Sequence, residues 1–334
     1  MFSSTPKLNR APLAILLVIG MLFVPITGSP ITQKEHSDNR SEKPLKIETD
    51  LVAVDAAVTD KDGNFVRNLK QSDFVVYEDG QPQKLDFFEA SEESDLTRPL
   101  AAVFALDISG SIKPEEIRKQ REAAESFVKL VRRDSLFAIL TFNYEIRVLQ
   151  DFTNDSKRIS DCFRRIGQTG GSTRLFQSID KAVSMLKHGP RVIGGRRLRR
   201  VVVVITDGYD SVDTIDQREL IRRANNEGVT VYSITIPSYA PSIGDKGRQR
   251  AITLLDAAEI VPLTGGSDYS ADSEDFTPAF KAIAEEVKSS YTLAYYPPDK
   301  TRHDGHSHQI RVEVKRPGLT VRASRQSYLA RTGG

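Results

Sequence analysis

The sequence predicts an α/β protein in which an open, doubly wound, mostly parallel sheet is inserted in a small β-sandwich. Two observations predict this fold class. Between Leu100 and Ser290, apolar runs of strand length alternate with segments of helical periodicity, as in a parallel sheet covered on both faces. On either side of this region, apolar residues alternate at period two, which is typical of strands with one buried face. At 334 residues the chain can form one large domain or two smaller ones.

The N-terminal segment has the layout of a secretory signal. Lys7 and Arg10 precede an apolar run over residues 11–26, and small residues follow it at Gly28 and Ser29. The run is shorter than the roughly 20 residues of a membrane-spanning helix. We therefore assign residues 1–28 to a signal peptide, with a retained N-terminal anchor as the alternative, and expect export to the periplasm, the cell surface or the medium.

The flanks that follow are predicted to be a linker and the two parts of a sandwich. Residues 29–45 are polar and charged without periodicity, which predicts a disordered linker. Residues 46–95 contain two predicted hairpin turns, at Asp62-Gly63 and Asp79-Gly80. Two hairpins bury too little surface to form their own core, so we expect them to pair with residues 291–330. The predicted inward faces are formed by Val52, Val54, Ala56 and Val58 in the first flank, and by Ile310, Val312 and Val314 in the second.

The central region, residues 98–290, supplies the predicted parallel sheet and its helices. The apolar runs that we expect to be strands lie at 100–107, 135–142, 200–207 and 229–237. A first predicted helix follows Pro114 and has one apolar face formed by Ile117, Ala124, Phe127, Val128 and Val131. A second has a face formed by Leu175, Ile179, Val183 and Leu186. A third begins at a capping Asp216 and ends at Gly228, and residues 275–290 form the last.

Polar side chains follow these strands at the edge where such sheets bind ligands. Asp107 ends the first predicted strand, and Asp207 ends the third before a glycine turn. Ser109 and Ser111 lie in the loop that leaves the first strand, and Thr173 begins a helix behind two glycines. Two carboxylates and three hydroxyls form an oxygen-only set that suits Mg²⁺, or Ca²⁺ or Mn²⁺.

This ligand set predicts how a bound metal would act. Neutral hydroxyls offset none of the metal's charge, so the ion stays electrophilic, and a position left to water could be filled by a partner's Glu or Asp. The alternative needs no metal. Asp107 would then cap its loop, the two serines would make turn hydrogen bonds, and Thr173 would be a helix N-cap.

The same residues carry a family resemblance. The D-x-S-x-S of "DISGS" (107–111), the threonine of "GGSTRL" (170–175) and the aspartate of "ITDG" (205–208) resemble the metal-ion-dependent adhesion site of von Willebrand factor type A domains. The resemblance covers residues 98–290 and implies a Rossmann-like sheet between helices. It also implies direct coordination by Ser109, Ser111 and Thr173, with Asp107 and Asp207 binding directly or through water. The flanks resemble those of a bacterial group called VWFA-related, known mainly from acidobacterial genomes.

We therefore expect an exported, non-enzymatic adhesion module that binds an acidic group of a protein partner through a divalent metal. A net charge of +2 predicts no nucleic-acid partner, and a membrane is expected only if the N-terminal segment is retained. One alternative is a metal-free scaffold of the cell envelope. Another is a metal-dependent phosphoester hydrolase with Asp107 as nucleophile, although Ser109 stands where that chemistry usually has a second acid. A serine hydrolase would need a histidine base, and four of the five histidines lie in the flanks.

Four further features carry less weight. Cys162 is the single cysteine, so an intramolecular disulfide or a thiolate zinc cluster is excluded. The group His303, Asp304, His306 and His308 suggests a transition-metal site, but a solvated polar turn is the preferred interpretation. The basic residues of 191–200 could meet an acidic partner, but a solvated loop is the preferred interpretation. Residues 237–250 are predicted to be a long loop on the ligand edge of the sheet that shapes selectivity, with a disordered insertion as the alternative.

Overall fold

The computed structural model describes residues 50–90, 98–131, 134–167, 170–212, 215–236, 253–271 and 275–332, which lie in one compact unit that begins at Thr49. The predicted signal peptide (1–28), the predicted linker (29–45) and the predicted 237–250 loop lie outside the described residues. Within those ranges, no helix is both long and apolar enough to cross a membrane.

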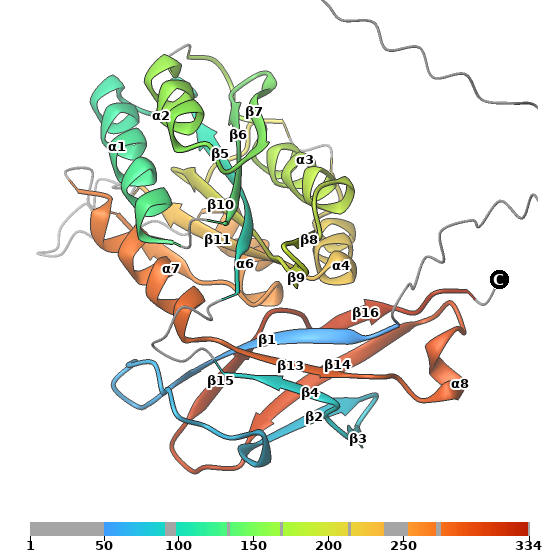
Figure 1. Cartoon of the computed structure of the whole chain (residues 1–334). Helices are drawn as coiled ribbons and strands as arrows, with labels where there is room; N and C mark the ends of the chain where they lie inside the picture. The colour runs from blue at the N-terminus through green and yellow to red at the C-terminus, as the bar shows by residue number, and fades with distance from the viewer. Residues whose placement is uncertain are drawn as a thin grey trace, which may run out of the picture. The chain divides into compact units, whose positions relative to one another are not determined.

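The central region forms a six-stranded sheet, which confirms the predicted α/β fold (Figure 1). Its strands, in spatial order, are β12 (Asp268–Ser270), β11 (Val229–Thr235), β10 (Arg199–Thr206), β5 (Leu100–Asp107), β6 (Leu136–Phe142) and β7 (Ile146–Thr153). All neighbours are parallel except β6 and β7, which are antiparallel. Strand β5 is buried along its whole length because both faces of the sheet are covered.

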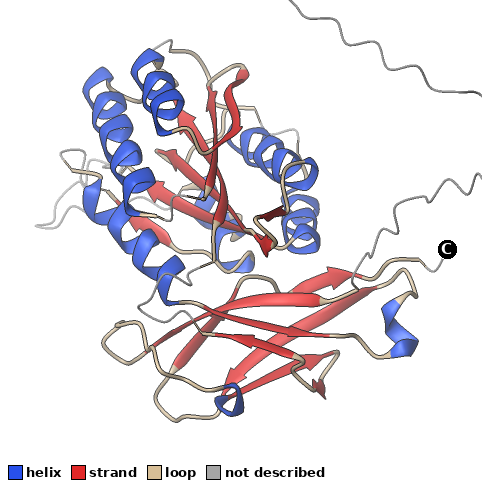
Figure 2. Cartoon of the chain, viewed as in Figure 1, coloured by secondary structure: helices blue, strands red, loops and turns tan. Residues whose placement is uncertain are grey.

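Helices cover both faces of this sheet (Figure 2). Side chains of α1 (Pro114–Leu130), α2 (Ser156–Arg165) and α7 (Thr277–Ser289) pack in one core cluster around Phe104. The opposite cluster includes α3 (Leu175–His188), α4 (Gln217–Glu227), α5 (Leu254–Ala257) and α6 (Ile260–Leu263). The predicted boundaries of α4 are confirmed. The Asp216 carboxylate accepts from two backbone N–H groups of the first turn, and Gly228 ends the helix at a φ of 60°.

The two flanks pair with each other in a β-sandwich, as predicted. One four-stranded sheet has the order β15 (Thr320–Ala323), β1 (Val52–Thr59), β13 (Tyr291–Tyr295) and β4 (Phe87–Glu89). The other has the order β16 (Ser327–Leu329), β14 (Ser307–Val314), β2 (Phe74–Glu78) and β3 (Gln81–Gln83). Val54 pairs with Leu293, and Val76 with Val312, so strands from both ends of the chain share each sheet. The smaller elements are η1 (Gln71–Asp73), β8 (Val192–Ile193), β9 (Arg196–Arg197) and α8 (Asp299–Arg302).

The two predicted hairpins differ in the structure. Asp79 and Gly80 have φ values of 49° and 80° and join β2 to β3 in a tight hairpin, as predicted. The first turn closes only a single bridge, between Thr59 and Phe65. The following segment is held instead by the Tyr291 hydroxyl, which donates to the carbonyl of Val66 and accepts from the N–H of Leu69.

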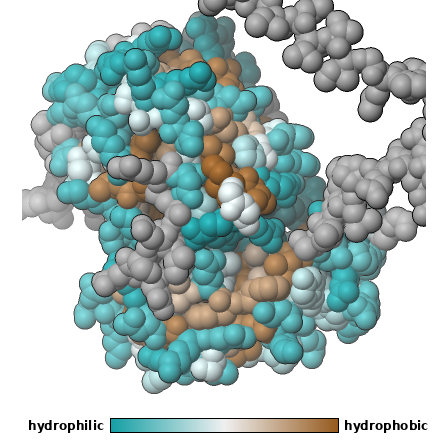
Figure 3. Space-filling view, in the orientation of Figure 1, coloured by the Kyte–Doolittle hydropathy of each residue, from teal (hydrophilic) through white to brown (hydrophobic). Residues whose placement is uncertain are grey.

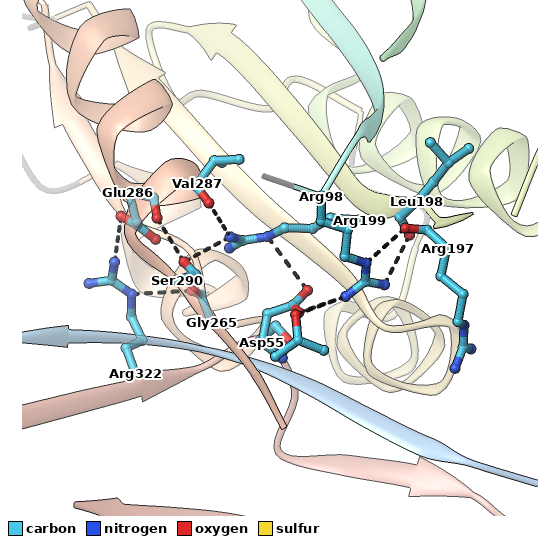
Figure 4. A network of polar contacts seen from close by, with 12 residues as sticks. Asp55, Arg98, Arg197, Leu198, Arg199, Gly265, Glu286, Val287, Ser290 and Arg322 are labelled. Carbon is cyan, nitrogen blue, oxygen red and sulfur yellow. Dashed lines mark hydrogen bonds and ion pairs between the residues drawn. The ribbon is translucent and has the colours of Figure 1, made fainter. Parts of the chain in front are cut away.

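The basic segment 191–200 is not a solvated loop throughout, so that prediction is wrong for its last residues. Arg199 is 5% exposed at the start of β10, and its guanidinium donates to Ser290 Oγ and to the Tyr232 hydroxyl. Figure 4 shows Asp55 of β1 between Arg199 and Arg98, with its carboxylate oxygens 3.6 Å from Arg199 Nε and 2.8 Å from Arg98 Nη1. Burial is tolerated because a carboxylate distant in sequence supplies the counter-charge.

A second buried contact joins the sandwich to the central sheet. Arg322 of β15 lies 2.5 Å from the fully buried Glu286 of α7 and donates to the carbonyl of Gly265 (Figure 4). Gly265 has a φ of +76°, and a Cβ atom at this position would lie 2.0 Å from the carbonyl oxygen of Ala323 in β15, so glycine is required here. The two parts of the chain are therefore in close backbone contact.

One face of the sandwich carries apolar surface, which Figure 3 shows over the region of β1, β13 and β4. A pocket of about 460 Å³ lies here, and its apolar lining consists of Leu51, Ala53, Phe87, Phe88 and Ala294. Phe87 is 52% exposed and contacts the ring of Tyr296. This surface belongs to the sandwich and not to the edge of the central sheet that carries the predicted metal ligands.

Candidate metal centre

Asp107 is the last residue of β5, and its side chain is fully buried. Its two carboxylate oxygens accept hydrogen bonds of 2.9 Å from the Ser109 N–H and 2.7 Å from the Thr206 hydroxyl. Burial raises the pKa of Asp107 to about 6, and the nearby Asp207 adds to the rise, while the hydrogen bonds from Ser109 and Thr206 oppose it. The charged form of this carboxylate is therefore costly unless a cation lies close to it.

The two serines of the D-x-S-x-S motif lie in the turn that follows. Their Oγ atoms are 3.1 Å apart; Ser109 is buried, whereas Ser111 is exposed. Between them, the N–H of Gly110 donates to the carbonyl of Gly171 at 3.2 Å. This bond attaches the first loop to the loop that carries Thr173.

Thr173 is 4% exposed and lies just before α3. Its carbonyl accepts from the Ser211 N–H at 2.9 Å, and its own N–H donates to Ser211 Oγ at 3.3 Å. Gly171 has a φ of +95° and a Cβ there would lie 2.7 Å from the Tyr144 ring, so only glycine fits. Thr173 is thereby fixed against the loop that follows β10.

Asp207 begins that third loop and is 7% exposed. The turn continues through Gly208, with a φ of +84°, and Asp207 Oδ1 accepts from the Tyr209 N–H. Among the described residues, neither Asp107 nor Asp207 forms an ion pair with a lysine, arginine or histidine. The three loops that carry the five predicted ligands are thus hydrogen-bonded to one another at the carboxyl edge of the sheet.

Sequence reasoning missed several residues that position these loops. Thr206 accepts from the Gly208 N–H and donates to Asp107, so its hydroxyl bridges the first and third loops. Asp210 accepts from the Phe176 N–H at the start of α3, and Asn143 donates to the carbonyl of Gly170. The sequence carried no signal for Thr206, because its place beside Asp107 depends on the parallel register that pairs Leu106 with Ile205.

The histidine-containing segment near the C-terminus forms a different arrangement. His308 is buried at the start of β14, with Nδ1 2.7 Å from Asp79 Oδ2 and Nε2 3.0 Å from Asp304 Oδ1. Both ring nitrogens are therefore engaged by carboxylates. In the described part of the chain, no group of three or more His, Cys, Asp or Glu side chains is arranged to hold a metal.

We expect His308 to make stability depend on pH. Burial lowers the pKa of His308, but hydrogen bonds and charge from Asp79 and Asp304 outweigh it and raise the pKa above 6.5. The resulting stabilisation is complete below pH 6.5 and is lost as pH rises through the folded-state pKa. Thermal unfolding should show a larger deficit for His308→Gln at pH 6 than at pH 9, with the exposed His188→Gln as control. A deficit of equal size at both pH values would contradict this assignment.

Comparison with known proteins identifies the central region. Residues 102–259 match the sequence model of the von Willebrand factor type A domain. This match lies within residues 98–290, the region for which the sequence motifs suggested the resemblance. The chain contains a von Willebrand factor type A (VWA) domain. Its central sheet and covering helices have the Rossmann-like form that the resemblance implied.

Two relatives match the VWA domain in part. Integrin alpha-M of Mus musculus is 30% identical over 150 residues, which cover 43% of this chain and 12% of the integrin. A protein of Borreliella burgdorferi named "Uncharacterized protein" is 28% identical over 146 residues, which cover 41% of this chain and 40% of that protein. The chain thus spans less than half the length of either relative.

One solved structure extends over more of the chain. A von Willebrand factor type A structure from Catenulispora acidiphila covers 78% of this chain and 74% of its own, with a TM-score of 0.46 and 12% sequence identity.

Proposed function

We propose that this protein is a non-enzymatic binding module whose VWA domain holds a divalent metal and, through it, an acidic group of a protein partner. The observation that carries the proposal is the pair of nearby carboxylates, Asp107 and Asp207, which lie beside three hydroxyls. Among the described residues, neither carboxylate forms an ion pair with a cationic side chain. A cation among them would offset the cost that burial imposes on the Asp107 charge. The donor set therefore fits a metal.

The residues that would hold the ion are Asp107, Ser109, Ser111, Thr173 and Asp207. Their oxygen-only chemistry suits Mg²⁺, or Ca²⁺ or Mn²⁺. When bound, the ion would supply a positive centre for a partner's carboxylate. Ser111 is exposed at this edge, so the site is accessible from solvent.

Two observations support a protein as the partner. Two integrin alpha chains match part of this chain, and we propose an adhesion role by analogy with them. Two aromatic side chains also flank the site, because Tyr144 is 49% exposed beside Gly171 and Tyr209 is 38% exposed after Gly208. Exposed tyrosines of this kind are enriched in protein interfaces. We further propose export to the periplasm, the cell surface or the medium, on the basis of the N-terminal sequence.

The domain limits that we propose are 46–95 and 291–330 for the sandwich and 98–290 for the VWA domain. Their support is that β4 and β13 lie in the sandwich, whereas β5 and α7 lie in the VWA domain.

The alternative functions are a metal-free scaffold of the cell envelope and a phosphoester hydrolase that uses Asp107. The arrangement favours neither acid-base chemistry nor a serine nucleophile, since His188 lies at the end of α3 with Nδ1 against the Ser184 carbonyl.

Calorimetric titration with MgCl₂, MnCl₂ and CaCl₂ tests the proposal. We expect saturable binding of at least one ion, weakened about tenfold or more in Thr173→Ala because one ligand is lost. Ser126→Ala on α1 is the control and should bind as the wild type does. Capture of a partner from the native cell envelope should then require the metal and disappear in EDTA.

Each alternative predicts another result. A complete lack of saturable binding for all three ions would favour the metal-free scaffold. Metal-dependent hydrolysis of a generic phosphate monoester, abolished by Asp107→Ala, would favour the hydrolase.

A further inference from the structure

Arginine side chains converge where the VWA domain meets the sandwich, at the end of β10 opposite the candidate metal centre. A small pocket of about 50 Å³ lies between β1, the start of β10 and the loop after β15. Five arginines line it, namely Arg98, Arg191, Arg197, Arg200 and Arg325. Asp55 is the one carboxylate among its described lining residues.

The nearby carboxylates are already engaged by other cations. Asp55 is 2.8 Å from Arg98 and 3.6 Å from Arg199. Glu227, the second acid that acts on these arginines, pairs with Arg191 at 3.0 Å, Arg200 at 3.4 Å and Lys187 at 3.8 Å. Two carboxylates are thus shared by five cations. Positive charge is therefore already in excess here, and Arg197 and Arg325 of the pocket add to it.

Those two arginines form no ion pair with any described residue. Arg325 is 9% exposed, and its Nε atom is buried without a hydrogen-bond partner. Arg197 is exposed and lines the pocket, and its backbone carbonyl accepts from Arg98 Nε. A buried guanidinium without a counter-charge is unfavourable, so its presence calls for an anion.

Local structure holds Arg325 in place. The Ser324 N–H donates to the carbonyl of Asp55, and the Gln326 N–H donates to Asn225 Oδ1, both at 2.7 Å. The guanidinium lies over Gly228, where a Cβ atom would be 2.0 Å from Nη2. Burial lowers the pKa of Arg325 to about 10, and Arg197 adds to this, against the charges of Asp55 and Glu227. The side chain is thus fixed at a place where burial is costly and no described carboxylate forms an ion pair with it.

We propose that this pocket binds a small oxyanion of the phosphate class, with Arg325 and Arg197 as its main ligands. Guanidinium groups bind phosphate oxygens through paired, charge-assisted hydrogen bonds. A dianion offsets the excess charge better than one carboxylate does. The volume matches roughly three to five water molecules, which is the size of one tetrahedral oxyanion. The anion would also connect the sandwich to the VWA domain.

The anion site is separate from the candidate metal centre. Arg200 and Thr206 lie at opposite ends of β10, and six residues of a parallel strand span about 20 Å. Loss of anion binding should therefore leave metal binding unchanged, so the two proposals can fail independently.

Calorimetric titration of the full chain with inorganic phosphate tests the site. The protein is kept in a buffer that contains neither phosphate nor divalent ions. We expect saturable binding of inorganic phosphate, weakened about tenfold or more in Arg325→Gln and in Arg197→Gln. Arg118→Gln, which alters an exposed arginine of α1, is the matched control and should bind as the wild type does. If Arg325→Gln does not fold, Arg197→Gln decides, since its side chain is exposed and packs in no core.

Three outcomes would overturn the proposal. They are no saturable binding up to about 10 mM phosphate, unchanged affinity in both pocket variants, or equal affinity for acetate, which would indicate a carboxylate site. Sodium chloride at matched ionic strength separates binding from screening. Methyl phosphate distinguishes the source of the anion. Binding as tight as that of inorganic phosphate supports a phosphoryl group on a larger molecule, and weaker binding supports the free anion.

Discussion

Asp107→Asn is expected to stabilise the metal-free protein while removing its response to divalent ions. The aspartate is fully buried, and burial with the neighbouring Asp207 raises its pKa from 3.8 to about 6. Asparagine has no charge to desolvate, and its oxygen can still accept from the Ser109 N–H. The same substitution removes a negative ligand from the proposed site. Stability and metal binding should therefore change in opposite directions.

The expected magnitudes follow from the titration of Asp107. A rise from 3.8 to about 6 corresponds to about 3 kcal/mol at neutral pH, so we expect the variant to gain about 1–3 kcal/mol in the absence of metal. In the wild type, the folded state keeps the proton to higher pH than the unfolded state. The free energy of unfolding of the metal-free wild type should therefore fall as pH rises from about 4 to about 6, and this fall should be absent in the variant.

Urea unfolding with and without MgCl₂ measures both effects. At a metal concentration of 100 times the dissociation constant, the wild type should gain about 2.7 kcal/mol, and Asp107→Asn should gain almost nothing. Asp62→Asn is the control, because this exposed residue precedes a glycine in a turn that asparagine also favours. A variant that is destabilised and still responds to Mg²⁺ would exclude Asp107 as a ligand.

Among substitutions where the sandwich meets the VWA domain, Asp55→Asn should cause the largest loss of stability. Burial raises the pKa of Asp55, but Arg98 and Arg199 outweigh it and the pKa is lowered below 3.8. The charge therefore stabilises the folded protein above pH 3.8, and the contribution is lost on acidification. Its removal leaves the guanidinium groups of Arg98 and Arg199 without the carboxylate that they share, which typically costs about 3–5 kcal/mol.

The substitution tests the side chain alone. The backbone N–H of Asp55 donates to Ser324 Oγ, and its carbonyl accepts from the Ser324 N–H. We expect both backbone bonds to remain in the variant. Urea unfolding at pH 7.5 in phosphate-free buffer should show the loss, with Asp62→Asn again as control. A loss below about 1 kcal/mol would mean that the cluster contributes little to stability.

Much of the fold was predictable because its signals are local. The apolar runs of β5 and β10, the period-two face of β1 and the caps of α4 are all encoded within a few residues. The candidate ligands were predictable for the same reason, since Asp107 and Asp207 end runs that can only be buried strands. Their metal-binding role stays a prediction.

What the sequence did not reveal depends on contacts between distant residues. The burial of Arg199 requires Asp55, and neither residue's surroundings in the sequence indicate the other. Strand β7 turns back antiparallel to β6, although the neighbouring strands are parallel. Thr206 and Asp210 became visible as supports of the site only when the strand register placed them beside Asp107 and α3.

The insertion of the VWA domain between β4 and β13 has a mechanical consequence. These strands are neighbours in one sheet, with Glu89 paired to Thr292, so the domain is tethered to the sandwich by two adjacent strands. A partner that pulls on the far edge of the domain would exert force on β4 and β13 together, and these two strands would act as the hinge. Asp55 adds a third point of attachment through Arg98 and Arg199, which resists rotation about that hinge. The tension on a captured partner would thus be borne by the sandwich as well as by the VWA domain.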